Sequence, residues 1–300
     1  MNGILIIDKP SGITSHDVVY KVRRILKTKR VGHTGTLDPF ATGVMVVLVG
    51  QATRLAQFLD KDEKEYKATV RFGFETDTGD LTGSPTTQVS GHTRISIDDV
   101  AATLDSFRGR IEQVPPMYSA KKVDGKKLYE LARKGETIER QPVSVNISKL
   151  EIGEKPTQND LEPGTWELGL TVACSAGTYI RTLAEGIGRK IGVGAHLTEL
   201  RRTAAGKFSI TEAVTLEHLA AKDDPVQTLI PMETAVLHLP KIVLNEERAA
   251  KTRNGLSTRV FETGFTDGEP IRMLDEGEKL IAIGYFNAAE NVVQPKVVLV

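Results

Sequence analysis

Three stretches of the chain alternate strictly between apolar and polar residues, which is the period of a β-strand with one covered face. They span residues 66–74, 143–147 and 166–174. In the first stretch Tyr66 falls on the apolar side, so we expect its ring to pack against the core. Two further runs, GILII near the start and VMVVLVG at 44–50, are apolar throughout and predict buried strands, the second of them central in a sheet.

Five segments carry the signals of helices. Ser15 can cap a helix that has an apolar stripe on one face and, on the other, the cations Lys21, Arg23, Arg24 and Lys27. The remaining predicted helices are 51–59, 97–107 (opened by a Ser96–Asp99 capping box), 125–135 (closed by Gly135) and one that starts near Thr178. Strands and helices that mix without β-α-β alternation point to an α+β fold.

The pattern changes near Leu237 to short β-type runs separated by turns, such as KIVL, LIAIGYF and KVVLV. This change predicts a separate, small β-rich domain over 237–300 and leaves 1–236 as the larger domain.

Composition narrows the class of protein. A chain of 300 residues with 40% apolar content can bury a sizeable core. No segment reaches the roughly 18 unbroken apolar residues of a membrane span, and the start lacks the features of a secretory signal, so we expect a soluble, cytoplasmic protein. The single cysteine, Cys174, excludes an internal disulfide, and its place in the third alternating run predicts a core thiol. No histidine pair has metal-ligand spacing, and we expect no metal.

The net charge is zero, but the charges are unevenly placed. Residues 1–60, 118–149 and 171–210 each sum to +4. Such segregation suits a basic groove that binds nucleic acid, because phosphate contacts need local positive charge. Solvated helix faces would produce the same sums, and charge alone does not separate the two interpretations.

The stretch GHTGTLDPFATG at 32–43 is rich in glycine and precedes the second apolar run. It is not a P-loop, because no glycine in it is followed by lysine, and its glycine spacing is not that of a dinucleotide-binding fingerprint. Asp38 before Pro39 fits either a plain turn or a catalytic carboxylate, and the loop itself leaves both open.

Five blocks of sequence, taken in order, resemble the TruB-type pseudouridine synthases, the bacterial enzymes that modify uridine 55 in the tRNA T-loop. The blocks are IDKPSGITSHDVV, GHTGTLDPFATG, EKEYKATVRFGFETDTGD, QVPPMYSAKKVDGKKLYELARKG and CSAGTYIRTLAEGIG, and together they cover roughly residues 3 to 210. The resemblance implies a mixed, mostly antiparallel central sheet flanked by helices and loops. The tail resembles an RNA-binding PUA module more weakly.

The resemblance also implies the chemistry. Uracil is detached from the ribose at N1, turned, and rejoined through C5, so no redox change occurs and no cofactor is expected. Asp38 matches the nucleophile of the family, and an aspartate of ordinary pKa, about 3.9, is ionised at neutral pH. Arg181 matches the arginine that pairs with it. Tyr66 matches the tyrosine that stacks on the target base and is a candidate for the proton removal.

Further matches imply contacts with the RNA. Tyr179 and Leu200 match pocket residues of the family. His33 matches the histidine that fills the gap left when the uridine is flipped out of its stack. Lys9 and the basic residues of an RNA-clamping insert at about 118–142 would meet phosphates; those of the insert are Lys121, Lys122, Lys126 and Lys127.

The T-arm of tRNA is thus the expected partner of a monomer with no membrane association and no obligate protein partner. Two other hypotheses remain. One is a non-catalytic RNA-binding or tRNA-folding protein on the same scaffold, and the other is a nucleotide-binding switch, which the missing lysine disfavours.

Overall fold

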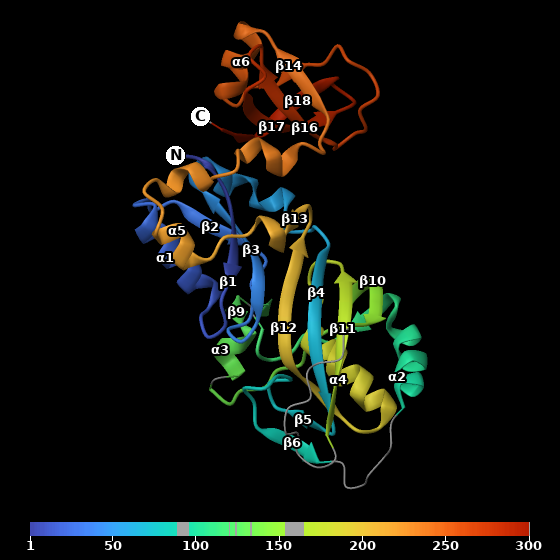
Figure 1. Ribbon diagram of the computed structural model, residues 1–300. Coiled ribbons are helices and arrows are strands. Elements are labelled where there is room, and N and C mark those ends of the chain that lie inside the picture. The colour runs from blue at the N-terminus through green and yellow to red at the C-terminus, as the bar shows by residue number, and fades with distance from the viewer. Residues whose placement is uncertain (89–95, 120, 124, 133, 154–164, 300) are drawn as a thin grey trace.

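The computed structural model describes residues 1–300 except 89–95, 120, 124, 133, 154–164 and 300 (Figure 1). One long sheet runs through the larger part of the molecule in the order β1-β3-β12-β4-β11-β10-β7, with β2 paired to β3 and β13 paired to β12. The strands are β1 (Gly3–Lys9), β2 (Val31–Thr34), β3 (Thr42–Val49), β4 (Lys64–Phe72), β7 (Gly109–Gln113), β10 (Val143–Ile152), β11 (Trp166–Cys174), β12 (Ala195–Ala205) and β13 (Phe208–Ser209).

Every pair in this sheet is antiparallel except β3 with β12. The prediction of an α+β fold with a mixed, mostly antiparallel sheet is therefore confirmed. The parallel pair matters for the site, because β3 and β12 are distant in sequence and lie side by side below the glycine-rich loop.

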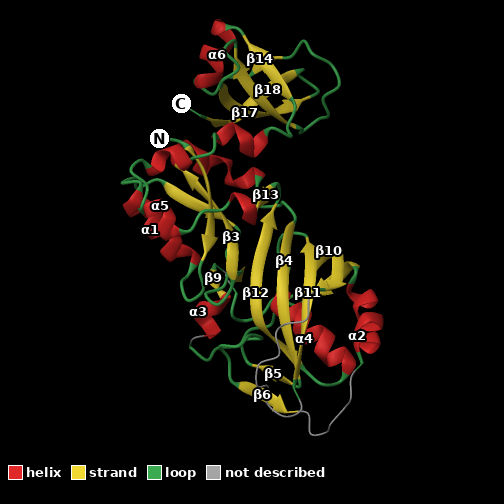
Figure 2. Cartoon of the chain, viewed as in Figure 1, coloured by secondary structure: helices red, strands yellow, loops and turns green. Residues whose placement is uncertain are grey.

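Helices pack against the sheet in two groups (Figure 2). α1 (Ser15–Ile25) and α5 (Leu216–Ala220) share a buried apolar cluster with β1, β2 and β3. α2 (Ile97–Leu104) and α4 (Ile180–Ile191) share another with β4, β10, β11 and β12. Two short hairpins, β5 (Phe74–Thr76) with β6 (Pro85–Gln88) and β8 (Lys122–Val123) with β9 (Lys126–Lys127), and the helix α3 (Leu128–Ala132) lie outside the long sheet.

Most predicted elements form, with differences at their ends. The cap of α1 is Thr14, not Ser15: the Thr14 hydroxyl accepts from the Asp17 amide in a full capping box. Ser15 is instead the first helical residue and is buried. The helix that begins after Ser96 ends at Leu104 and continues as a 3₁₀ turn, and the segment predicted at 51–59 is a 3₁₀ helix, Gly50–Phe58.

β12 was not predicted from the pattern. Its sequence, AHLTELRRTAA, places His196 and Arg202 on buried positions, where a strand normally carries apolar side chains. A buried arginine removes the alternation that identifies a strand. The missed strand is central, since it lies between β3 and β4.

The C-terminal residues form a second, five-stranded sheet in the order β14-β16-β17-β18-β15. Its elements are β14 (Lys241–Leu244), α6 (Glu246–Arg253), β15 (Thr258–Arg259), β16 (Pro270–Asp275), β17 (Leu280–Asn287) and β18 (Val292–Val298). This sheet has its own buried cluster and also shares one with β1 and β3, so the two parts are packed together. No helix in the described ranges is long and apolar enough to cross a membrane.

Candidate active site

Asp38 lies on the loop between β2 and β3, and buried side chains hold this loop on both sides. Lys9, at the end of β1, is fully buried and donates to the carbonyl oxygens of Pro10 (2.9 Å), Pro39 (3.2 Å) and Ala41 (2.8 Å). An ammonium has three donors, and all three are used. The expectation that Lys9 meets a phosphate is therefore wrong; it fixes the loop next to Asp38.

Residues from α1 and β12 complete the support of the loop. The Ser15 hydroxyl accepts from the Leu37 amide at 2.9 Å and donates to the Leu37 carbonyl at 3.1 Å. Arg202, only 1% exposed, donates to the carbonyls of Val44 (2.6 Å) and Gly35 (2.9 Å). Sequence reasoning missed Arg202 because its strand was missed.

Gly43 explains why glycine is needed at the end of this loop. Its φ is +102°, and a Cβ there would lie 2.2 Å from the carbonyl oxygen of Arg202. Any side chain at this position would force β3 and β12 apart. The loop leads into β3, and β12 carries Arg202, which supports the loop.

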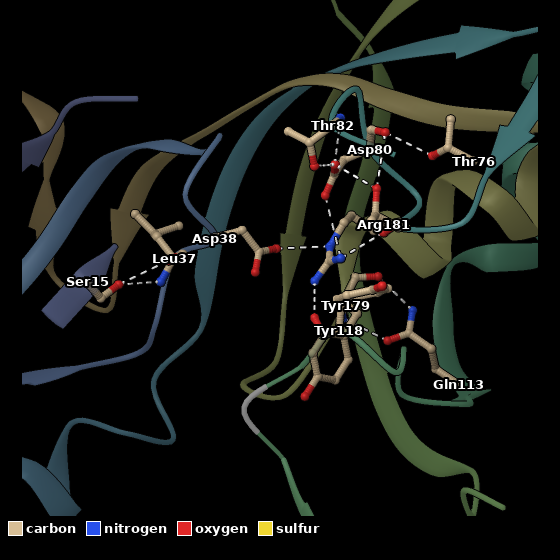
Figure 3. Close-up of polar contacts among 11 residues, drawn as sticks. Ser15, Leu37, Asp38, Thr76, Asp80, Thr82, Gln113, Tyr118, Tyr179 and Arg181 are labelled. Atoms are coloured by element: carbon tan, nitrogen blue, oxygen red, sulfur yellow. Dashed lines mark hydrogen bonds and ion pairs between the residues drawn. The ribbon is translucent and has the colours of Figure 1, made fainter. Parts of the chain in front are cut away.

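Arg181 holds the Asp38 carboxylate from the first turn of α4 (Figure 3). Its Nε lies 2.9 Å from Asp38 Oδ2, while its two terminal nitrogens donate to the carbonyls of Thr78 (2.8 Å) and Tyr118 (2.7 Å). The residue is 4% exposed. A guanidinium bound on three sides has one available orientation, so it aims the carboxylate as well as balancing its charge.

A second carboxylate, Asp80, lies on the far side of the guanidinium, with its Oδ2 3.6 Å from a terminal nitrogen of Arg181. Asp80 is buried, and its Oδ1 accepts from the hydroxyls of Thr78 (2.9 Å) and Thr82 (2.5 Å) and from the Thr82 amide (2.9 Å). The sequence signal was available, since Asp80 closes the block EKEYKATVRFGFETDTGD, but its role was not recognised.

Burial raises the pKa of the Asp38 carboxyl above its ordinary value, and Asp80 raises it further. Arg181 and Lys9 act in the opposite direction and favour the ionised form. Burial also lowers the pKa of Lys9 to about 8. The pKa of Asp38 is therefore above the ordinary value assumed from the sequence. A more basic carboxylate suits a group that must form a bond.

A cavity of about 230 Å³ opens beside Asp38. Its lining includes all the catalytic candidates and two of the pocket candidates: Asp38, Tyr66, Tyr179, Arg181 and Leu200. Tyr66 and Leu200 are buried on neighbouring strands, so an aromatic ring and an aliphatic chain form its apolar part. Burial raises the pKa of both tyrosines, and Arg202 partly offsets this at Tyr66, so both phenols are protonated at neutral pH.

His33 lies on β2 and is not part of the cavity lining. Its ring meets that of His16 edge to face, with 5.9 Å between centroids, and its Nδ1 is buried without a hydrogen-bond partner in the described ranges. Burial lowers the pKa of His33 to about 4, and His16 and Arg202 act in the same direction. The ring is therefore a neutral aromatic surface at physiological pH.

The first residues of the basic insert are held by hydrogen bonds, one of them to Arg181 of the site. Tyr118 binds Arg181, and the Ser119 and Lys121 carbonyls accept from the amides of Tyr129 and Leu128, respectively. Lys121 is half-buried and Lys126 is exposed. The side chains of Lys122 and Lys127 lie outside the described part of the structure, although their backbones pair in the β8–β9 hairpin.

The single cysteine and the possible metal ligands are the remaining groups with chemical potential. Cys174 is buried, as predicted, and burial raises its pKa to about 11, so it is a neutral core thiol. Over the residues that the structure describes, no three His, Cys, Asp or Glu side chains gather closely enough to hold a metal ion.

The sheet and the site together define the class of protein. A mixed, mostly antiparallel sheet brings Asp38, Tyr66 and Arg181 around one cavity, and the family comparisons identify the class as pseudouridine synthases. The TruB family pseudouridylate synthase N-terminal domain matches residues 23–180, and the tRNA pseudouridylate synthase B C-terminal domain matches residues 181–237. The chain belongs to the TruB family of pseudouridine synthases.

Individual proteins agree with this assignment. The chain is 41% identical to tRNA pseudouridine synthase B of Bacillus subtilis, over 100% of this chain and 98% of the relative. It is 39% identical to tRNA pseudouridine synthase B of Aquifex aeolicus, over the full length of both. Among solved structures, a chain in the crystal structure of a Cbf5–Nop10–Gar1 complex aligns with a TM-score of 0.74 and 27% identity, over 99% of this chain and 85% of the other.

Proposed function

We propose that this protein is a tRNA pseudouridine synthase that isomerises uridine 55 of the T-loop. The observation that carries the proposal is the pairing of the half-buried Asp38 carboxylate with the buried Arg181, at the edge of a cavity that Tyr66 and Tyr179 also line. The relatives named tRNA pseudouridine synthase B, matched over the whole chain, support tRNA as the substrate. Position 55 rests on the resemblance of the five sequence blocks. A tRNA substrate also favours the cytoplasm as the site of action.

Asp38 acts as the nucleophile in this proposal. The bond between N1 and C1′ breaks, a bond between C5 and C1′ forms, C5 loses one proton and N1 gains one. The bond that Asp38 forms to the substrate is broken again before release, so atoms and electrons balance without a redox partner. Arg181 holds one carboxylate oxygen at 2.9 Å, which leaves the other oxygen of Asp38 available to the substrate. The loop contacts of Lys9 and Arg202 keep this geometry in place before the substrate arrives.

Tyr66 provides the stacking surface for the flipped uracil. The ring lines the cavity together with Leu200 of the neighbouring strand, and stacking on an aromatic ring is worth about 1–3 kcal/mol per base. Because its phenol stays protonated at neutral pH, Tyr66 acts first as a packing surface and hydrogen-bond donor. Tyr179 also lines the cavity and completes the pocket.

RNA contacts outside the cavity are assigned by the same proposal. The neutral ring of His33 takes the place of the extruded base, and Lys121 and Lys122 contact the backbone of the T-arm. The C-terminal part, 237–300, adds further RNA-binding surface, and the chain acts as a monomer without an obligate protein partner.

A non-catalytic RNA-binding protein is the alternative function. Such a protein has no need for a carboxylate that is held by a buried arginine and backed by a second, buried carboxylate, because burying charges is costly. Asp38, Tyr66 and Arg181 all line one cavity here, which favours the enzyme.

The test uses an unmodified tRNA transcript and maps pseudouridine by reverse-transcription stops at carbodiimide adducts. We expect the wild type to modify position 55, and Asp38→Asn to bind the tRNA but form no product. Asp98→Asn, an exposed aspartate on α2, is the matched control and should behave as the wild type. An unmodified position 55 with the wild type would refute the proposed function. A normal rate with Asp38→Asn would refute the nucleophile assignment alone.

A further inference from the structure

The exposed side of α1 carries cations that the proposed reaction does not use. Four residues on this side are exposed: Tyr20, Lys21, Arg24 and Lys27. The three cations follow Tyr20 by one, four and seven residues, which places all four residues on one side of the helix and its C-terminal end. We call these four residues the α1 cationic face. The neighbouring Arg23 and Arg30 are excluded, because they donate to Val31 and Thr53.

The positive charge of this face is not neutralised. None of its three cations forms an ion pair within the described ranges of the chain. The one acid of α1, Asp17, is committed to the helix cap, since it accepts from the amide and hydroxyl of Thr14 at 2.8 and 2.6 Å. The hollow between α1 and α5 is bordered by Lys21 and Arg24 and by a single acid, Glu217. A polyanion is the partner that such a surface attracts.

Tyr20 makes the surface more specific than a charged patch. Its side chain is 59% exposed, which is unusual for a large aromatic residue, and the Arg24 guanidinium lies 5.9 Å from the centre of its ring. An aromatic ring beside an arginine offers both a stacking plane and a phosphate ligand. This combination favours RNA over an acidic protein surface.

The face begins at the proposed site. The first residue of α1, Ser15, is bonded to Leu37, next to Asp38, and His16 contacts His33. Arg24 comes nine positions after Ser15, so at 1.5 Å per residue it lies about 13 Å further along the helix axis. In Figure 3, Ser15 and Leu37 lie on one side of Asp38, while Arg181 and Tyr118 of the insert lie on the other. RNA seated over the cavity and under the insert would therefore continue along α1.

We propose that the α1 cationic face binds the sugar–phosphate backbone of the substrate tRNA, adjoining the flipped uridine. It contributes affinity and leaves the chemical step unchanged, because none of its residues lines the cavity. The inference rests on the proposed function for the identity of the RNA.

The experiment compares the double variant Lys21→Gln/Arg24→Gln with the wild type. Glutamine keeps a good helix propensity and removes the two charges. Dissociation constants for a tRNA transcript are measured by filter binding between 50 and 200 mM salt. Each lost phosphate contact reduces the slope of log K against log salt by about 0.7 to 0.9. We expect the double variant to bind about tenfold more weakly than the wild type at 50 mM salt. Because two contacts are lost, the ratio of the two dissociation constants should fall by a factor of roughly 7 to 12 between 50 and 200 mM salt, which brings it close to one.

A matched control removes two exposed cations from the opposite edge of the sheet. Arg110→Gln/Lys190→Gln changes the net charge equally, at β7 and at the end of α4, and should bind as the wild type. Single-turnover rates at saturating enzyme should be the same for all three proteins. The proposal is wrong if the α1 variant binds like the control, or if its weaker binding does not depend on salt. Absence of pseudouridine with the wild type would refute the proposed function separately, since binding is measured without turnover.

Discussion

Replacing Arg181 with lysine tests the central geometry of the site, because the charge is kept while the planar fork is lost. Arg181 reaches Asp38, Thr78 and Tyr118 with three different nitrogens at 2.7–2.9 Å. A lysine ammonium is a single centre and cannot reach all three partners at once. We expect it to lose at least two of these contacts, each worth about 1.5 kcal/mol when one partner is charged.

A loss of about 3 kcal/mol in positioning corresponds to roughly a hundredfold slower chemical step, at 1.36 kcal/mol for each factor of ten. The assay is a single-turnover measurement at saturating enzyme, following tritium release from tRNA labelled at C5 of uridine. The matched control is Arg189→Lys on the same helix, whose side chain is exposed and pairs with Glu75. Retention of more than a fifth of the wild-type rate by Arg181→Lys would refute the argument that the guanidinium aims Asp38.

Other predictions follow from the charges around this pair. Asp80→Asn should slow the single-turnover rate about tenfold and leave the dissociation constant for tRNA within twofold, since Asp80 contacts Arg181 but does not itself line the cavity; an equal loss in binding would contradict this. The rate should fall as pH drops through the raised pKa of Asp38, because the carboxylate is the active form, so the acid limb of the pH–rate profile should lie above the ordinary aspartate pKa. The imidazole of His33 should titrate near pH 4 by NMR. Its contribution to the stability of the fold should be complete above about pH 6.5 and should be lost as the pH falls towards 4. A titration midpoint near pH 6.5 would show that the ring is not buried.

Much of the fold could be predicted from local pattern. The strands β3, β4 and β11 and the capping box of α2 appear where alternation, apolar runs and a Ser–Asp spacing indicated them. The strand β12 could not be found in this way, because a buried arginine and a buried histidine interrupt its apolar face. Those polar residues are stable only through partners supplied by distant segments, such as the carbonyls of Gly35 and Val44.

The site shows the same division. Asp38, Tyr66 and Arg181 were identified from their motifs, and the structure places them around one cavity. Lys9 was assigned to phosphate from the resemblance of its sequence block, whereas the folded loop closes over it and supplies three carbonyl acceptors. Asp80 was overlooked although it closes one of the five blocks, because only the fold shows that it shares a guanidinium with Asp38.

The sequence by itself determined the family and its reaction class, since five ordered blocks of residues carry the resemblance. It also determined most of the secondary structure, because alternation, helical period and capping act over a few residues. Only the tertiary structure decided which cations are exposed and which hold the loop. Exposure and hydrogen-bond partners arise from contacts between segments as far apart as β1, β3 and β12, and these contacts exist only when the chain is folded.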